Sequence, residues 1–162
     1  MGEPNERFES LFRTHYAPLV RALTFAAGSR EAASDAVQDS FVQLHRHWTK
    51  LSRYDEPVAW LRRVAVNRVR NQRRSERRAR AALWRKTSTE HAGPDGAALD
   101  LHDALKRLPR GQRLVVGLHY LADLSVRQVA EALEVSEGTV KSQLHDARRA
   151  LRTGLEVADD DR

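Results

Sequence analysis

Apolar residues recur every three or four positions along most of this chain, and that spacing predicts amphipathic helices. No segment alternates apolar and polar residues over a useful length, so the pattern predicts an all-α protein without strands. Three helices are predicted in the first half. The first opens near Pro4 and ends at Gly28, the second follows Ser29 as its N-cap, and the third starts at Pro57, which suits a first helical turn.

Residues 125–151 carry the most informative pattern, because they predict two short helices joined by a tight turn. Ser125 followed by Gln128 has the spacing of a capping box, and Ser136 can cap the second helix by accepting from the amide of Thr139. One face of that helix is apolar. The opposite face carries long or polar groups: Glu137, Thr139, Lys141, Ser142, His145, Arg148 and Arg149. This pattern is typical of a helix-turn-helix whose second helix enters the DNA major groove, although an ordinary helical hairpin is the alternative.

A polar segment divides the chain into two predicted domains. Residues 87–97 combine Ser, Thr, Gly, Pro and Asp, a composition that predicts a flexible linker. Residues 1–86 before it form the predicted N-terminal domain. Residues 98–162 after it form the C-terminal domain, in which helices over 98–108 and 110–121 precede the helix-turn-helix. We therefore expect two small helical domains joined by a flexible linker.

Positive charge is concentrated in one window of the chain. Residues 62–86 contain eleven basic residues and one acidic residue, a net charge of +10, whereas the whole chain carries +6. The remaining 137 residues therefore carry −4. A block this dense repels itself unless an anion is nearby, so its expected partner is a phosphate backbone. A solvated basic helix, or nonspecific binding to RNA, is the alternative interpretation.

Several functional classes lack support in the sequence. The chain has no cysteine, which excludes disulfides and thiolate metal sites and fits the cytoplasm. No run of about 18 apolar residues predicts a membrane span, and no secretory signal pattern opens the chain. His45 and His47 are two positions apart, so on a helix they point to different faces and form no metal pair. Without a glycine-rich phosphate loop, a nucleophile elbow or paired carboxylates, we expect no enzyme, no cofactor and no metal.

The chain resembles the extracytoplasmic-function (ECF) sigma factors of bacterial RNA polymerase. Residues 108–152, above all the string SEGTVKSQLHDAR at 136–148, are similar to the DNA-binding domain of that family. The N-terminal half resembles the first domain of the family, in order and spacing, in three segments: FESLFRTHYAPLVRAL, DAVQDSFVQLHRHW and DEPVAWLRRVAVNRVRNQRR. The intermediate domain of housekeeping sigma factors has no counterpart between them. Trp48 and Trp60 are similar to the pattern of an actinobacterial SigE-like branch.

The resemblance implies a protein that binds core RNA polymerase, melts the minus-ten promoter element and reads the minus-thirty-five element. It implies two further partners, which are promoter DNA (duplex and melted non-template strand) and an anti-sigma factor. In the family, the second helix docks on an arginine-rich coiled coil of the largest polymerase subunit. At that place this chain has Asp35, Gln38, Asp39, Phe41, Val42 and Gln43. Acids beside an apolar patch suit such a partner.

The resemblance assigns minus-ten opening to the third helix and the loop before it. Opening needs a basic surface to hold separated strands and a place to receive an unstacked base. The corresponding residues are Lys50, Arg53, Tyr54, Arg62, Arg63, Asn67, Arg70, Arg73 and Arg74. Asn67 is the preferred base-edge contact, because its amide can pair bidentately. Trp48 and Trp60 fall on apolar faces, which favours core packing over base stacking but leaves both open.

The resemblance assigns the minus-thirty-five element to the second helix of the helix-turn-helix. The residues implied are Ser136, Glu137, Thr139, Lys141, Ser142, His145, Arg148 and Arg149. This chain departs from the family at Glu134, where glycine is usual, so we expect a strained turn or a turn of another type. The competing hypothesis is a stand-alone helix-turn-helix regulator, which would need a sensor or dimer domain and a palindromic site.

Overall fold

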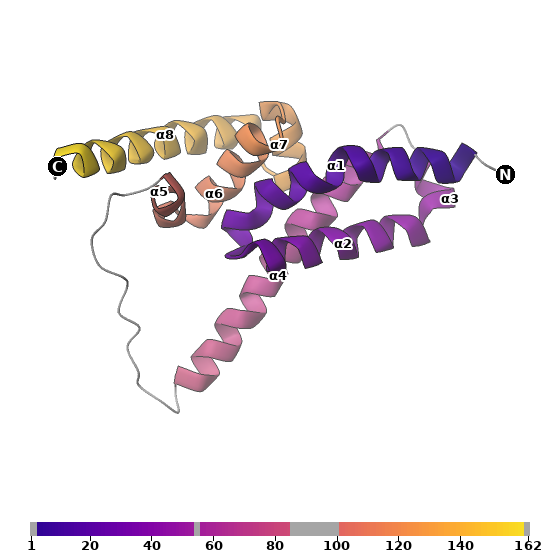
Figure 1. Ribbon diagram of the computed structural model, residues 1–162, viewed down its shortest axis with the longest axis horizontal. Coiled ribbons are helices and arrows are strands. Elements are labelled where there is room, and N and C mark those ends of the chain that lie inside the picture. Colours follow the sequence, from indigo (N-terminus) through magenta and orange to yellow (C-terminus); the bar gives the residue numbers. More distant parts are fainter. Residues whose placement is uncertain (1–2, 54–55, 85–100, 161–162) are drawn as a thin grey trace.

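The computed structural model describes residues 3–53, 56–84 and 101–160, and the all-α prediction is confirmed there (Figure 1). The N-terminal half contains α1 (Glu3–Ala27), α2 (Arg30–Arg46), the single-turn α3 (Trp48–Leu51) and the long α4 (Pro57–Trp84). The C-terminal half contains α5 (Leu101–Arg107), α6 (Arg110–Val116), a π-helical turn η1 (Gly117–Leu121), α7 (Val126–Leu133) and α8 (Glu137–Asp160). The predicted linker over 87–97 lies outside the described residues. No described helix is long and apolar enough to cross a membrane.

Local signals explain where the N-terminal helices begin and end. Gly28 follows α1 with a φ of 90°, and its amide donates to the carbonyl of Thr24 at 2.9 Å. Ser29 then caps α2, because its hydroxyl oxygen accepts from the amide of Ala32 at 3.1 Å. Pro57 begins α4 as predicted. Helices α1, α2 and α4 pack on one another through their apolar faces and bury the core of this half.

The helix-turn-helix has the predicted caps. Ser125 and Gln128 form a reciprocal capping box at the start of α7, and the amide of Thr139 donates to Oγ of Ser136 at 3.1 Å at the start of α8. Between the two helices the backbone passes through Glu134 in the left-handed conformation, with φ 57° and ψ 46°. The strained turn expected at this residue is therefore present.

The helix predicted over 110–121 is regular only as far as Val116. At Gly117 the hydrogen-bonding pattern widens, because its carbonyl accepts from the amide of Ala122 at 3.2 Å. A five-residue spacing defines a π turn, which no periodicity of apolar residues distinguishes from an α-helix. The chain then turns, and the amide of Leu124 donates to the carbonyl of Leu118 at 3.1 Å.

The two halves share one continuous apolar core. Buried residues from both halves form a single cluster, in which α1 packs against α6 and η1 and α4 packs against α7 (Figure 1). The backbones approach closely at Gly117, where a Cβ atom would lie 2.0 Å from the carbonyl oxygen of Ala22. Only glycine fits at that distance. Arg110 also donates to the carbonyl of Val69 at 2.8 Å. The predicted domains therefore lie in direct contact.

Candidate nucleic-acid interface

The outer face of α8 presents the predicted minus-thirty-five residues to solvent. Val140, Leu144 and Ala147 are buried against the core. Their burial turns the opposite face outward, and every member of the predicted set is exposed: Ser136, Glu137, Thr139, Lys141, Ser142, His145, Arg148 and Arg149. The structure therefore brings all eight together on one accessible surface. Ser136 and Thr139 also bond to each other through their hydroxyls at 2.9 Å.

Arg148 is oriented by a residue outside the helix-turn-helix. Its Nε donates to the hydroxyl of Tyr120 at 2.7 Å, and its guanidinium carbon lies 5.8 Å from the centroid of that ring. Sequence reasoning missed Tyr120, because a contact with a residue 28 positions away leaves no local signal. Arg149 has a weaker restraint, since its Nη2 lies 3.9 Å from the carboxylate of Asp146 at the surface.

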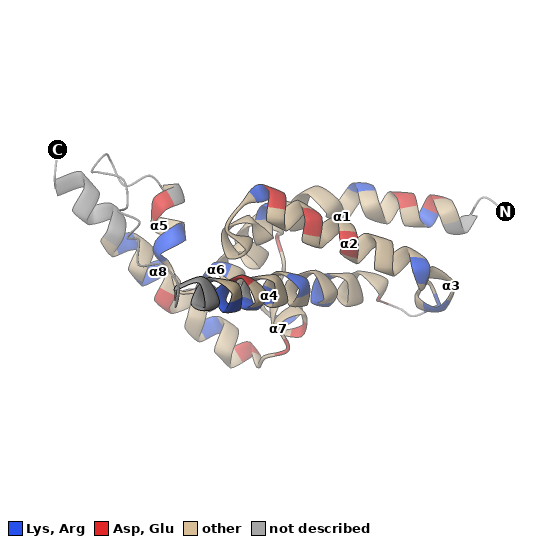
Figure 2. Cartoon of the chain, turned by 90° about the horizontal axis from the view of Figure 1, so that it is seen from below, with Lys and Arg blue, Asp and Glu red and all other residues tan. Residues whose placement is uncertain are grey.

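Helix α4 carries the second basic surface, and Figure 2 shows basic residues along it and along α8. The predicted residues on α4 differ in exposure. Arg63 and Arg74 are exposed, whereas Arg62, Asn67 and Arg70 are half-buried. The side chain of Arg73 lies outside the described residues. The predicted minus-ten residues from position 62 onward therefore all lie on α4. The basic window over 62–86 continues to the C-terminal end of this helix.

Part of this basic surface faces the helix-turn-helix. Nη1 of Arg70 donates to the carbonyl of Leu133 at 3.2 Å, and Nη1 of Arg63 lies 3.8 Å from the carboxylate of Glu134. Burial lowers the pKa of Arg70, while Glu134 opposes that effect and favours the charged form. Burial likewise lowers the pKa of Arg62, opposed by Glu56 and then by Glu131. Both guanidinium groups stay charged, because their ordinary pKa is far above neutrality.

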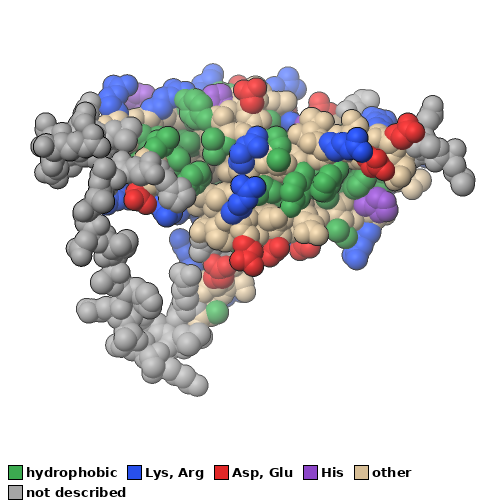
Figure 3. Space-filling model, viewed as in Figure 1, with side chains coloured by type: hydrophobic (Ala, Val, Ile, Leu, Met, Phe, Trp, Pro, Cys, Tyr) green, Lys and Arg blue, Asp and Glu red, His purple; other side chains and the backbone are tan. Residues whose placement is uncertain are grey.

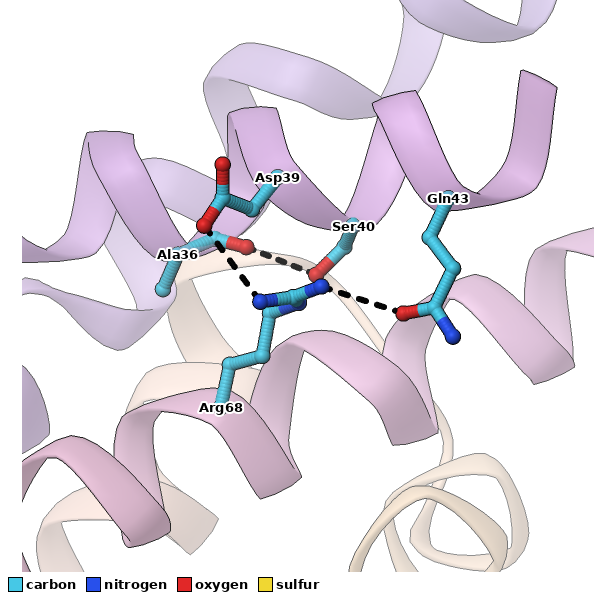
Figure 4. A network of polar contacts seen from close by, with 5 residues as sticks. All are labelled: Ala36, Asp39, Ser40, Gln43 and Arg68. Carbon is cyan, nitrogen blue, oxygen red and sulfur yellow. Dashed lines mark hydrogen bonds and ion pairs between the residues drawn. The ribbon is translucent and has the colours of Figure 1, made fainter. Parts of the chain in front are cut away.

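Helix α4 also contacts α2 through Arg68, which belongs to no predicted set (Figure 4). Its Nη1 lies 3.3 Å from Oδ2 of Asp39, and its Nη2 donates to Oε1 of Gln43 at 3.1 Å. Beneath these contacts, the fully buried Ser40 donates its hydroxyl to the carbonyl of Ala36 at 2.6 Å. Two predicted docking residues, Asp39 and Gln43, are thus oriented by α4, yet the Asp39 side chain remains 65% exposed.

A pocket of about 690 Å³ lies between the end of α2, α3 and the start of α4. Its lining residues are His47, Lys50, Leu51, Glu56, Ala59, Trp60 and Arg63. Lys50 and Arg63, both predicted minus-ten residues, meet in this pocket. Arg53 is exposed on the turn after α3, and Tyr54 lies outside the described residues.

The two tryptophans have different surroundings. Trp48 is 8% exposed, and its ring packs edge-on against that of Phe8 with centroids 5.4 Å apart. Trp60 is half-buried and forms part of the pocket wall beside α3. Trp48 is therefore a core residue, whereas Trp60 has one side open to the pocket.

Separate from that pocket, a groove of about 550 Å³ runs between α1 and α2. It is lined by Phe8, Phe12, Tyr16, Gln38, Phe41, Val42, His45 and Arg46. Phe41 is only 3% exposed and contacts the Phe12 ring at a centroid distance of 4.8 Å, so this predicted docking residue supports the groove from below. Val42 is 45% exposed, and Asp35 and Gln38 are exposed nearby.

The groove has an aromatic wall that the sequence analysis did not identify. Phe8 and Phe12 share the apolar stripe of α1, and periodicity alone does not separate a buried face from a groove wall. Figure 3 shows apolar side chains gathered between α1 and α2, with acidic side chains along one edge of the same face. Among the described residues, no three His, Asp or Glu side chains are grouped as metal ligands.

Known protein families match both halves of the chain. Residues 11–79 match the family described as Sigma-70 region 2, and residues 98–151 match Sigma-70 region 4. The ECF RNA polymerase sigma factor SigL of Mycobacterium tuberculosis is 35% identical over 155 residues, which cover 91% of this chain and 88% of that protein. The RNA polymerase sigma-E factor of Streptomyces coelicolor is 33% identical over 173 residues, with coverages of 98% and 91%.

Two solved structures are similar in fold. CnrH, in complex with the cytosolic domain of CnrY, superposes with a TM-score of 0.65 at 28% identity and covers 94% of this chain and 90% of its own. The sigma factor RpoE of Bartonella quintana, solved with the anti-sigma factor NepR, superposes with a TM-score of 0.60 at 24% identity. The coverages for RpoE are 92% of this chain and 96% of its own.

Proposed function

Since the chain belongs to the extracytoplasmic-function family of RNA polymerase sigma factors, we propose a division of labour among its helices. As an alternative sigma factor, the protein binds core RNA polymerase and directs promoter-specific initiation. In the proposal, α2 and its groove dock on polymerase, α3 and α4 open the minus-ten element, and α8 reads the minus-thirty-five element. The chemistry of RNA synthesis belongs to the polymerase, so the protein itself carries no catalytic step and acts in the cytoplasm.

The observation that carries the proposal is the exposed polar face of α8. The apolar stripe buried below it supports this assignment, because it leaves the polar side of the helix open to DNA. Residues near the start of α8, such as Lys141 and Ser142, are suited to base edges, whereas Arg148 and Arg149 are suited to phosphates. The hydroxyl of Tyr120 limits the rotamers of Arg148, which reduces the entropy lost when that side chain meets a phosphate.

Docking on polymerase is assigned to the acidic edge of α2 and the aromatic groove beside it. Asp35 and Asp39 supply carboxylates to an arginine-rich partner, and the groove accepts an apolar side chain between Phe12 and Val42. Arg68 supports this role, because it holds Asp39 and Gln43 on the outer side of the helix.

Opening of the minus-ten element is assigned to the pocket beside α3 and the arginines of α4. The pocket combines cationic groups from Lys50 and Arg63 with the indole of Trp60. A base that leaves the stack needs a π surface and polar edges, and its backbone needs cations. Trp60 therefore takes the stacking role in this proposal, and Trp48 supports the fold.

We also propose that the groove between α1 and α2 is open to an anti-sigma factor. The similar proteins CnrH and RpoE were each solved with a second protein, and for RpoE that protein is an anti-sigma factor. An anti-sigma segment that covers the groove would compete with polymerase for it.

The direct test is run-off transcription with core polymerase over a promoter library, followed by permanganate mapping on the promoter it selects. We expect Arg74→Ala, which removes an exposed arginine of α4, to weaken strand opening and to lower the salt slope of binding by about 0.7. The defect should shrink on a template with a pre-melted bubble. Equal defects on both templates would exclude a role in melting, and no promoter-specific transcript would refute the proposal.

A further inference from the structure

The exposed tyrosine of the π turn is held in place by its neighbours. Tyr120 is 52% exposed, and its ring packs edge-on against that of His119 with centroids 4.8 Å apart. Nδ1 of His119 in turn donates to the carbonyl of Leu124 at 2.7 Å, because a carbonyl oxygen only accepts. Leu118, two residues before the tyrosine, is fully buried. Tyr120 therefore projects into solvent from an anchored turn.

The hydroxyl of Tyr120 keeps an unused hydrogen. Its oxygen accepts from Nε of Arg148 at 2.7 Å. A phenol can both accept and donate, so the hydrogen of this hydroxyl points away from the guanidinium. Among the residues that the structure describes, none accepts that hydrogen. The hydroxyl can therefore donate to a ligand while it still holds Arg148.

The guanidinium of Arg148 also keeps donors for a ligand. The contact with the phenol uses Nε and leaves the N–H groups of both Nη atoms. One N–H of Nη2 points parallel to that of Nε, which is the arrangement that arginine uses in bidentate pairs with phosphate. An oxygen atom bound at Nη2 would therefore lie beside the hydroxyl of Tyr120. One phosphate oxygen can accept from both residues at once.

The partner that orients Arg148 is neutral, and this leaves the arginine charge uncompensated. The next residue, Arg149, lies 3.9 Å from the carboxylate of Asp146. In the described part of the chain, no carboxylate forms such an ion pair with Arg148. An acid at position 120 would also hold the guanidinium, but its charge would oppose the approach of a phosphate. The phenol orients the arginine without that opposition.

Arg148 lies on α8 where the helix is expected to leave the major groove. Because an α-helix rises 1.5 Å per residue, Arg148 is about 10 Å further along the axis than Lys141. The major groove is about 12 Å wide, so when Lys141 is among the base edges Arg148 meets the backbone of one strand. Tyr120 is beside Arg148 at that point, although it precedes α7 in the chain.

We propose that Tyr120 and Arg148 form a phosphate clamp at the edge of the minus-thirty-five site. In this clamp, Tyr120 donates its hydroxyl to the same DNA phosphate that Arg148 binds through Nη2. Tyr120 is then a DNA-binding residue outside the helix-turn-helix, and it does more than orient the arginine. The inference rests on the function proposed above for α8. The clamp carries no sequence information and fixes the position of α8 in the groove.

The test measures binding of the holoenzyme, formed from core polymerase and the full chain, to a fluorescent promoter duplex. Tyr120→Phe keeps the ring and removes the hydroxyl, and we expect about three- to tenfold weaker binding, the range for one hydrogen bond. The slope of log affinity against log salt should not change, because no charge is lost. Arg148→Ala, which removes a cation, should lower that slope by about 0.9. Undiminished binding by Tyr120→Phe would overturn the proposal.

Thr153→Val is the matched control on the same helix. It removes an exposed hydroxyl that donates to the carbonyl of Arg149 at 3.1 Å. We expect the control to bind as the unmodified protein does, and circular dichroism checks that both variants are folded. Equal losses in Tyr120→Phe and Thr153→Val would mean that any hydroxyl near α8 matters, and the clamp would be refuted.

Two further measurements distinguish a direct contact from an orienting role. Neutral methylphosphonate groups replace the phosphates of the minus-thirty-five element one at a time. We expect one position where this replacement weakens the unmodified protein but has less effect on both Arg148→Ala and Tyr120→Phe. In the Arg148→Ala background, Tyr120→Phe should still cost about twofold in affinity. If it costs nothing there, the hydroxyl acts only through Arg148, and the proposed contact is wrong.

The same assay tells failure of the inference from failure of the proposed function. If Lys141→Ala and Arg148→Ala weaken binding while Tyr120→Phe does not, α8 binds the element without the clamp. If neither Lys141→Ala nor Arg148→Ala changes binding, the function proposed for α8 is wrong, and the inference falls with it.

Discussion

At the scale of single residues, acidic side chains that look equivalent in the sequence have different surroundings. Asp35 and Asp39 are one helical turn apart and both exposed, but only Asp39 has an ion pair with Arg68. Reversing the charge at Asp39 would bring two cations together and disturb the packing of α2 on α4. Asp35 therefore offers the cleaner test of polymerase docking.

We expect Asp35→Arg to lower the affinity for core polymerase at least about tenfold, because it opposes an arginine-rich partner with a like charge. Co-purification with tagged core polymerase measures the loss, and circular dichroism checks the fold. Asp103→Arg makes the same charge change on α5 and should retain binding. Undiminished binding by the Asp35 variant would exclude this edge of α2 from the interface.

His15 provides a pH-dependent contribution to stability. Burial, and then the positive charge of Arg62, lowers the pKa of His15 below its ordinary 6.5. Below that pH the unfolded chain binds a proton that the folded chain does not, so the stability falls as the pH decreases through about 6.5. Above about pH 6.5 His15 is neutral in both the folded and the unfolded chain, so it causes no loss of stability there. We expect His15→Gln to show a flatter decline between about pH 7 and 5.5, measured by urea unfolding. Identical slopes in the two proteins would contradict this assignment.

At the scale of elements, the helix ends were predictable and the helix interiors less so. Caps are local, so Ser29, Ser125 and Ser136 each marked the start of a helix from sequence alone. The end of the regular helix at Val116 had no such marker. The aromatic wall of α1 was also missed, because the position of a groove depends on the neighbouring helix and not on the stripe itself.

The recognition helix α8 yields a prediction about specificity. Changing Lys141 or Ser142 should alter the preferred minus-thirty-five sequence, at a cost of about 1–3 kcal/mol for the original site. Arg149→Ala should weaken all sites alike, because a phosphate contact carries no sequence information. Selection from a randomised element, read by sequencing, separates the two outcomes. A shifted preference in the Arg149 variant would reverse the assignment of bases and phosphates along α8.

At the scale of the whole molecule, the sequence predicted the components and not their association. Two helical regions in the right order follow from periodicity, caps and resemblance. The contact of Gly117 with Ala22 joins residues far apart in the chain, and a single glycine in an apolar run gives no hint of what lies opposite. The basic window over 62–86 likewise predicted a phosphate partner for α4. It did not reveal that the end of α7 packs against the same helix.

The whole protein should bind duplex promoter poorly without polymerase, since each half offers a small footprint and the halves are closed on each other. We expect titration of the isolated protein to show weak, salt-sensitive binding, and core polymerase to add both affinity and specificity. Tight, sequence-specific binding of the isolated protein to a palindromic duplex would instead identify a dimeric regulator that acts without polymerase.

The π turn at Gly117–Leu121 corresponds, in the terms of sequence alignment, to one inserted residue. A relative that lacks one residue here would have a regular helix, and the side chains beyond the gap would be rotated by about 100°. Tyr120 would then no longer face Arg148, although no loop had changed length. A one-residue gap at this position in an alignment therefore marks relatives whose recognition helix lacks the contact between this tyrosine and arginine.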